Sequence, residues 1–315
     1  MIDIVLATYN GEAFIAEQIK SIQSNTGYQT RINKIIVTDD GSTDCTQKIV
    51  LELAEKDPKL IWINNTTDIH GPKSNFQFGL KQSSANYIML CDQDDVWLPH
   101  KIETSITALL EVEKRTSPQT PLLVFSDKQI VDEQLQLICD SYFTLKNISK
   151  NWHLKFNQLC QQNVVSGCTM LVNRALINKA LPIPEKAYMH DWWLALVAHR
   201  CGEIVFIDQA LIQYRQHNHN TIGAQKKTFF SLCKKFITHL NTFKKSQQNI
   251  VKQAIVFKEF EQQNRLSPDT TISILSCFND LPLKKKIVYF YNGNVTRSHL
   301  FGRIALLITL LTNKN

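Results

Sequence analysis

The sequence predicts an α/β domain with a mixed, largely parallel central sheet flanked by helices, followed by a basic helical extension. Strand and helix patterns alternate over the first part of the chain, and acidic residues follow two of the predicted strands. Positive charge is concentrated after residue 225, where 15 lysines and arginines stand against four acids. We therefore expect a first domain at residues 1–225 and a basic, amphipathic helical region at residues 226–315.

The composition is that of a folded protein. The chain has 315 residues, of which 43% are hydrophobic and 20% are charged, with a net charge of +7. No apolar run approaches the roughly 20 residues that span a bilayer, and the longest is Ile304–Leu311. The first residues lack the basic segment of a signal peptide, so we expect a cytoplasmic location.

Short apolar runs predict four strands in the first part of the chain, at Ile2–Thr8, Ile32–Thr38, Leu60–Ile63 and Tyr87–Cys91. Apolar residues spaced by three to four positions predict helices between them, one over Glu12–Ser24, one capped by Ser42 and Asp44, and one beginning at Pro72. Strands that alternate with helices in this way indicate parallel pairing.

The second part of the chain predicts further strands and two helices. The strands are expected at Leu122–Ser126, Gly167–Val172, Glu203–Ile207 and Leu211–Arg215. The helices are expected at Asp191–Arg200 and over the long stretch Thr228–Phe260.

The acidic residues predict one shared site. Asp39 and Asp40 follow the second strand, and Asp92-Gln93-Asp94-Asp95 follows the fourth. Open α/β sheets bind ligands at the carboxyl ends of their strands. Carboxylates two residues apart suit Mg²⁺ or Mn²⁺, while the alternative is an acidic turn that caps the next helix through Asp95. Glycine-rich phosphate loops are absent, which favours a diphosphate bridged by a cation.

Several motifs in order resemble a family 2 glycosyltransferase with the GT-A nucleotide-diphosphosugar fold. The resemblance covers about residues 1–225, and parts of it are most similar to bacterial rhamnosyltransferases of cell-surface polysaccharide synthesis, such as O-antigen or capsule. The motifs are Thr8–Glu12, Val37–Asp44, Ala85–Asp95, Gly167–Met170, His190–Trp193 and Tyr214–His217.

The resemblance implies a nucleotide-sugar pocket. In it, Asp39 would accept the N3–H of uracil or thymine, and Asp92 would contact the ribose. Neither role distinguishes a UDP donor from a dTDP donor. The other residues implied for the nucleotide or its diphosphate are Thr8, Tyr9, Glu12, Lys73 and Asn75.

The resemblance also implies the catalytic groups. Asp94 would bind the metal with help from His217, and Asp191 would be the general base that deprotonates the acceptor. His190 stands where the family usually has glutamate, and it and Trp192 are expected on the acceptor side. Of Trp192 and Trp193, one is expected in the core and one toward the acceptor. The alternatives are that Asp191 is a helix N-cap and His217 part of a polar loop.

These roles imply an inverting, metal-assisted glycosyltransferase. The best-supported donor is dTDP-rhamnose, with a lipid-linked glycan as acceptor. The alternatives are transfer of a hexose or N-acetylhexosamine from UDP by the same family, and a non-catalytic GT-A domain that binds glycans. A nucleotidyltransferase is disfavoured because its glycine-rich loop is missing.

The basic C-terminal region suggests a membrane surface as partner. Thr228–Phe243 gathers its apolar residues on one helix side, Lys284-Lys285-Lys286 forms a basic cluster, and Leu300–Leu311 is apolar. This combination suits docking on the anionic inner face of the cytoplasmic membrane, and the alternative is a helical cap on the first domain. No nucleic-acid-binding module is recognised.

Overall fold

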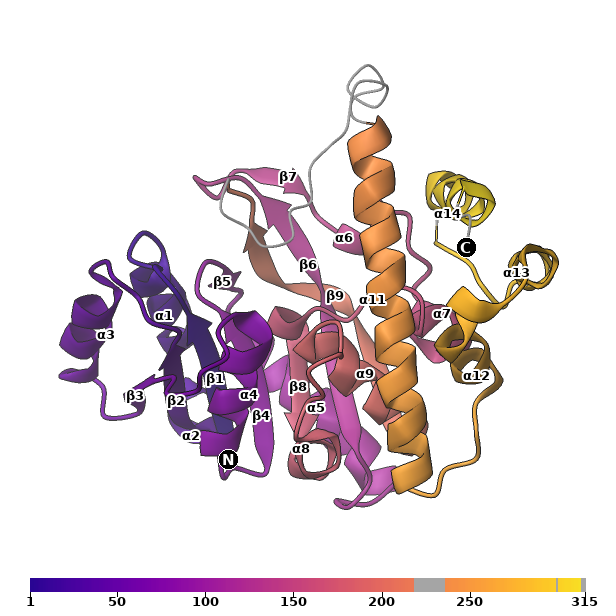
Figure 1. The fold of residues 1–315 in the computed structure, drawn as a ribbon. Coiled ribbons are helices and arrows are strands. Elements are labelled where there is room, and N and C mark those ends of the chain that lie inside the picture. Colours follow the sequence, from indigo (N-terminus) through magenta and orange to yellow (C-terminus); the bar gives the residue numbers. More distant parts are fainter. Residues whose placement is uncertain (218–235, 299, 313–315) are drawn as a thin grey trace. The chain divides into compact units, whose positions relative to one another are not determined.

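The computed structural model describes the backbone of residues 1–217, 236–298 and 300–312 (Figure 1). The chain divides into two compact units. The first unit contains Met1–Leu145, Val165–Ile183 and the described residues of Met189–Ala224. The second contains Lys146–Val164, Pro184–Tyr188 and the described residues of Gln225–Asn315. Two short segments expected in the first domain thus fall in the second unit, and the division at residue 225 stays a prediction.

One mixed sheet forms the centre of the first unit. Its strand order is β3-β2-β1-β4-β8-β6-β9-β5, with β7 paired to β6. Pairing is parallel along β3-β2-β1-β4 and between β6 and β9, and antiparallel elsewhere. The predicted mixed sheet is confirmed. The strands are β1 (Ile2–Thr8), β2 (Ile32–Asp39), β3 (Leu60–Asn64), β4 (Tyr87–Asp92), β5 (Val96–Trp97), β6 (Leu122–Val131), β7 (Leu137–Cys139), β8 (Met170–Asn173) and β9 (Glu203–Arg215).

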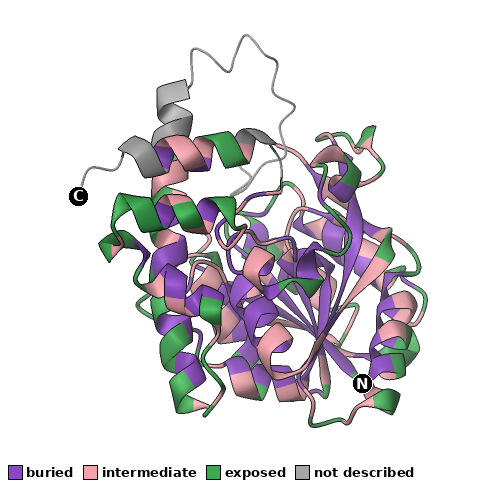
Figure 2. Ribbon diagram, turned by 90° about the vertical axis from the view of Figure 1, so that its right-hand side faces the viewer, coloured by how far each residue is buried: buried purple, intermediate pink, exposed green. Residues whose placement is uncertain are grey.

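Helices cover the sheet, so its central strands are almost wholly buried (Figure 2). Strands covered on both faces read as continuous apolar runs, which is why the first four strands could be located from the sequence. The helices of the first unit are α1 (Ile15–Gln23), α2 (Tyr28–Arg31), α3 (Thr46–Ala54), α4 (Pro72–Gln82), α5 (Lys101–Arg115), α6 (Tyr142–Leu145), α8 (Arg174–Ala180) and α9 (His190–Cys201).

Three elements differ from their predicted form. The two strands expected at Glu203–Ile207 and Leu211–Arg215 are one continuous strand, β9, which pairs with β6 across register shifts. The strand expected at Gly167–Val172 starts only at Met170, after a 3₁₀ turn over Gly167–Thr169. Helix α1 starts at Ile15 rather than Glu12, after a turn in which the Gly11 carbonyl accepts from the N–H groups of Phe14 and Ile15, each over 3.0 Å.

Helix α4 packs unusually close to the sheet at Gly79. A Cβ atom at this position would come within 2.5 Å of Val5 Cγ1 and 2.9 Å of Thr38 Cγ2. Glycine therefore allows the helix to approach β1 and β2, and Pro72 begins the helix as predicted.

The second unit is helical. A buried polar group joins its segments, because the Arg297 guanidinium donates to Gln161 O and to Gln247 Oε1, the latter over 2.9 Å. The unit contains the 3₁₀ turns Trp152–Leu154 and Phe278–Asp280 and the helices α7 (Phe156–Leu159), α11 (Phe236–Gln263), α12 (Thr270–Ser276), α13 (Leu283–Tyr291) and α14 (Leu300–Thr312).

The long helix expected at Thr228–Phe260 is seen as α11 from Phe236 onward, and residues 228–235 lie outside the described part of the chain. The apolar side predicted over Thr228–Phe243 lies mostly outside the described side chains. Among the helices that the structure describes, none is long and apolar enough to cross a membrane.

We expect Gly79→Ala to lower the free energy of unfolding by about 1–3 kcal/mol, because the added methyl group overpacks α4 against Val5 and Thr38. This outcome opposes the intrinsic helix preference, which favours alanine over glycine by about 1 kcal/mol. Urea denaturation followed by circular dichroism measures it. The control is Gln82→Ala at the exposed end of the same helix, and equal or greater stability of Gly79→Ala would contradict the prediction.

Candidate active site

The parallel strands bring three predicted site residues to one edge of the sheet. Thr8 at the end of β1 is in register with Asp39 at the end of β2. On the other side of β1, Ala7 is in register with Asp92 at the end of β4. Both acidic segments thus follow strands that flank β1 and end at the same edge of the sheet, and the shared site there stays a prediction.

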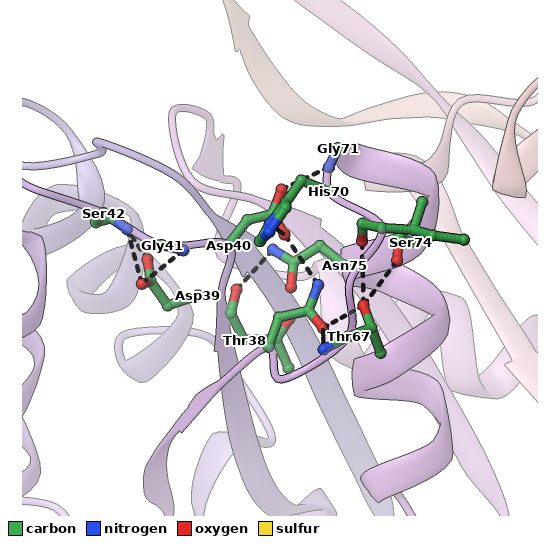
Figure 3. Close-up of polar contacts among 12 residues, drawn as sticks. Thr38, Asp39, Asp40, Gly41, Ser42, Thr67, His70, Gly71, Ser74 and Asn75 are labelled. Carbon is green, nitrogen blue, oxygen red and sulfur yellow. Dashed lines mark hydrogen bonds and ion pairs between the residues drawn. The ribbon is translucent and has the colours of Figure 1, made fainter.

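Asp39 is held by its own loop (Figure 3). Its carboxylate accepts hydrogen bonds from the backbone N–H groups of Gly41 (3.1 Å) and Ser42 (2.9 Å) and from the Ser42 hydroxyl. Gly41 has a φ of +92°, a conformation that glycine adopts without strain and that lets the loop turn back onto the carboxylate. Asp39 is thus fixed in orientation before any ligand arrives.

The neighbouring Asp40 holds the start of α4 in place (Figure 3). Its carboxylate accepts from the Gly71 N–H (2.6 Å) and from Asn65 Nδ2 (2.9 Å), and His70 Nδ1 lies 3.1 Å away. Asn75, one turn into the helix, is buried and donates to the carbonyls of Thr8 (3.2 Å) and Thr38 (2.8 Å).

Asn75 therefore joins the ends of β1 and β2, and its Oδ1 atom is buried with no hydrogen-bond partner. Lys73 is half-buried in the first turn of the same helix. Both residues lie at the predicted nucleotide side, and their role in binding stays a prediction.

Gln93 organises the segment after β1, a role that the sequence analysis missed. Its Oε1 accepts from the Thr8 hydroxyl (2.6 Å) and from the Tyr9 N–H (2.9 Å), while its Nε2 donates to Tyr9 O (3.1 Å). The Tyr9 side chain is exposed. Glu12 accepts from the Cys45 N–H (2.8 Å) at the start of α3, so one of its oxygens supports that helix.

Asp94 and His217 meet directly. The pairing of β5 with β9 carries the segment after β4 alongside the end of β9, and Asp94 Oδ2 lies 2.9 Å from His217 Nε2. Both side chains are largely buried, and the His217 ring packs on Phe14 with ring centroids 4.9 Å apart. The two predicted metal ligands are thus adjacent.

Arg215 holds the segment of Asp94 against the end of β9. The sequence did not indicate this role. The buried guanidinium donates to Asp94 O (3.0 Å), to Glu133 O (2.5 Å) and to the Glu17 carboxylate. Its backbone N–H lies 3.3 Å from Asp95 Oδ1. One side chain therefore fixes both the acidic segment and the strand end that carries His217.

The carboxylates of Asp92 and Asp95 lie close to the Cys168 thiol. One ligand atom from each of Asp92, Asp95 and Cys168 lies within 4.8 Å of the others. Desolvation by burial and the nearby Asp94 charge raise the pKa of Asp92 to about 7, against the opposing effect of Lys128. Burial, Asp94 and Asp92 raise the pKa of Asp95 well above its usual value.

This edge fits a divalent cation. Asp94 and His217 are in direct contact, so both could reach one ion. In addition, Asp95 Oδ2 is buried without a hydrogen-bond partner. Asp94 and His217 would hold the ion, with Asp92 beside it, and oxygen ligands suit Mg²⁺ or Mn²⁺.

Asp191 lies in the first turn of α9, and the N-cap of this helix is Met189. The capping alternative for Asp191 is therefore wrong. Asp191 Oδ2 accepts from the Gly167 N–H (3.2 Å) and Oδ1 from the Trp192 N–H (2.6 Å). Because the next residue is Cys168, the turn at Gly167–Thr169 contacts the predicted base on one side and the carboxylates on the other.

His190 is buried and stacks on Phe76, with ring centroids 4.1 Å apart. Neither of its ring nitrogens has a hydrogen-bond partner, and burial lowers its pKa to about 3. Trp192 and Trp193 are both buried, and Trp193 Nε1 donates to Ala180 O (2.9 Å). Trp193 is thus the tryptophan in the core, and the place of Trp192 on the acceptor side stays a prediction.

Comparisons with known proteins identify the family of the chain. The family model "Glycosyl transferase family 2" matches residues 3–177. A dTDP-rhamnosyl transferase RfbG of Shigella flexneri is 29% identical over 227 residues, which covers 70% of this chain and 74% of that protein. An uncharacterised glycosyltransferase of Haemophilus influenzae is 28% identical over 232 residues, covering 70% and 67%.

Solved structures show the fold. Staphylococcus aureus TarS 1-349 in complex with UDP-GlcNAc aligns with a TM-score of 0.57 at 15% identity, covering 98% of this chain and 89% of that one. The mannosyltransferase PcManGT of Pyrobaculum calidifontis, in complex with GDP-Man and Mn²⁺, aligns at 0.55 and 13% identity, covering 100% and 88%. The chain belongs to glycosyl transferase family 2 and has the GT-A fold, so it is a glycosyltransferase.

The lowered pKa of His190 predicts acid sensitivity. A histidine with a pKa of 6.5 unfolded and about 3 folded binds more protons in the unfolded chain, so stability is full above pH 6.5 and falls as the pH drops toward 3. Between pH 7.5 and 5 this group should cost about 2 kcal/mol of unfolding free energy.

Urea denaturation at pH 7.5 and pH 5 should show this loss of unfolding free energy in the wild type. His190→Phe should not show it. The control is His100→Phe at an exposed histidine, which should keep the wild-type pH dependence. An unchanged pH dependence in His190→Phe would refute the assignment.

Proposed function

We propose that this glycosyltransferase moves a sugar with inversion from a nucleotide diphosphate donor to a lipid-linked glycan acceptor in cell-surface polysaccharide synthesis. One observation carries the proposal. The turn at Gly167–Thr169 donates a hydrogen bond to Asp191 through Gly167 and places the Cys168 thiol among Asp92 and Asp95. The turn thus links Asp191, the base we propose, to the acidic edge, which supports a site for two substrates.

We further propose L-rhamnose from dTDP-rhamnose as the transferred sugar. The support is the 29% identity with the dTDP-rhamnosyl transferase of Shigella flexneri over most of both chains. A UDP-hexose or UDP-N-acetylhexosamine donor is the second candidate, since the aligned TarS structure holds UDP-GlcNAc. Asp39 suits both donors, because uracil and thymine present the same N3–H.

In this proposal, different residues of the chain bind the donor and activate the acceptor. Asp39, preoriented by its loop, would accept the N3–H of the base, and Asp92 would contact the ribose. Asp191 would take the proton from the attacking hydroxyl, and the N–H groups of Gly167 and Trp192 hold its carboxylate in place. A divalent cation held by Asp94 and His217 would stabilise the negative charge on the leaving diphosphate.

Donor binding tests the proposal. We expect calorimetry with dTDP-rhamnose, UDP-galactose and UDP-GlcNAc to show binding of dTDP-rhamnose that requires Mn²⁺. Asp94→Asn should lose this binding, because it removes a charged ligand, whereas Asp191→Asn should keep it. With a membrane lipid extract as acceptor, Asp191→Asn should transfer sugar about 10²–10⁴ times more slowly.

Asp140→Asn, at an exposed carboxylate, is the matched control and should behave as the wild type. If a UDP-sugar binds more tightly than dTDP-rhamnose, that UDP-sugar becomes the proposed donor. Folded protein that binds none of the three donors with Mn²⁺ present would refute the proposal, and full transfer by Asp191→Asn would remove that residue as the base.

We also propose peripheral attachment to the inner face of the cytoplasmic membrane through the second unit. Helix α13 supports this, because Leu283, Val288 and Tyr291 are 45%, 53% and 73% exposed. Lys284 and Lys285 are exposed on the same helix. Apolar residues flanked by lysines suit the headgroup region of an anionic bilayer.

The predicted basic cluster is smaller than the sequence indicated. Lys286 is buried, and its ammonium donates to Asn279 O over 3.1 Å. Lys284 and Lys285 thus carry the exposed charge of this triplet.

Replacing Lys284 and Lys285 with glutamate should reduce co-sedimentation with liposomes of phosphatidylglycerol and phosphatidylcholine at least tenfold. The reason is that each lysine near an anionic surface contributes about 1 kcal/mol. The control replaces the exposed Lys56 and Lys81 of the first unit with glutamate, which makes the same change of net charge. Equal binding by the two double variants would refute α13 as the attachment site.

A further inference from the structure

Lys128 is a buried cation beside the acidic edge to which the proposed reaction assigns no role. It lies on β6 at a register shift against β9, between Asp127 and Gln129, and is only 6% exposed. Such irregularities redirect a side chain away from the regular alternation of a strand. Its Nζ donates to the Ser166 hydroxyl over 3.0 Å.

The ammonium group of Lys128 is enclosed by aromatic rings. It lies 3.7 Å from the ring centroid of Tyr214 and 4.7 Å from that of Tyr142. Burial lowers its pKa, but Cys168, Tyr142, Asp95 and Asp92 nearby outweigh this effect and raise the pKa above its usual value. Lys128 therefore carries a positive charge at neutral pH.

A second buried lysine, Lys101, shows that burial alone does not raise the pKa of an ammonium group. It is also fully buried near the same turn, with Nζ donating to Cys168 O (3.1 Å) and lying 4.9 Å from the Trp97 ring centroid. Burial lowers its pKa to about 8. Of these two lysines, Lys128 is the one whose charge opposes both Asp92 and Asp95.

We propose that Lys128 is a positioning residue that supplies the counter-charge of the acidic edge and weakens its affinity for a free divalent cation. Retention of the cation then depends on the negative diphosphate of the donor. This inference rests on the proposed function. The fixed charge repels an incoming cation, and the donor diphosphate restores the attraction, so cation and donor bind together.

Lys128→Gln tests the inference, because glutamine is neutral yet keeps a donor for Ser166. MnCl₂ is titrated into the full chain, and free Mn²⁺ is measured by electron paramagnetic resonance without nucleotide and with dTDP or UDP. Without nucleotide, the variant should bind Mn²⁺ about tenfold more tightly, as expected for loss of a nearby unit charge in a medium of intermediate polarity. Adding nucleotide should increase the Mn²⁺ affinity of Lys128→Gln by a smaller factor than it increases that of the wild type.

Lys128→Arg, which keeps the charge, should bind Mn²⁺ like the wild type, and Lys81→Gln, which removes an exposed positive charge from α4, should change the affinity less than twofold. Damage to the site would weaken binding, so tighter binding separates a charge effect from a structural one. Circular dichroism verifies folding, and Lys128→Met is a second neutral variant. If both neutral variants unfold, Lys128 is structural and the inference fails.

The outcomes separate the two proposals. If the wild type binds Mn²⁺ with nucleotide and folded Lys128→Gln binds no more tightly without it, the inference fails and the proposed function stands. If neither the wild type nor any variant binds Mn²⁺ under either condition, both the cation of the proposed function and the role of Lys128 are overturned.

Discussion

Mutual repulsion among carboxylates at one sheet edge is the constraint around which the first unit is built. Parallel pairing of β1 with β2 and β4 leads the chain to this edge twice, and each time the strand ends in aspartate. Charges brought together away from water destabilise a fold unless donors or cations surround them. Backbone N–H groups surround the Asp39 carboxylate, whereas the Asp95 carboxylate accepts from the Arg215 N–H and the Asp94 carboxylate contacts His217. The local fold is therefore inseparable from the chemistry it positions.

The two sides of the edge solve this problem differently. On the β2 side, loops fold back on Asp39 and Asp40, so that the acids stabilise the backbone that carries them. On the β4 side, support comes from a distant segment, because Arg215 at the end of β9 binds the Asp95 carboxylate through its N–H and Glu17 on α1 through its guanidinium. The loop after β2 thus holds its own acids, whereas the acids after β4 are held from the end of β9.

Local patterns explain what could be predicted. Buried strands give continuous apolar runs, a proline marks the start of α4, and aspartates follow the apolar runs of β2 and β4, so β1 to β4 and these acids were placed correctly. Long-range packing explains what was missed. Arg215 contacts segments more than 80 residues away, and Lys128 reaches its neighbours through a register shift that sequence periodicity does not reveal. The burial of Trp192 and of Lys286 is likewise set by the elements that pack around them.

The turn at Gly167–Thr169 makes neighbours of groups from separate parts of the chain. Asp191 binds its first residue, Lys101 binds the carbonyl of Cys168, and Lys128 binds Ser166 just before it. Groups that share a support do not contribute independent free energies. Substitutions on opposite sides of this turn should therefore show coupling in a double-mutant cycle. Attempts to recombine acceptor and donor preferences from relatives must exchange the turn together with the residues it supports.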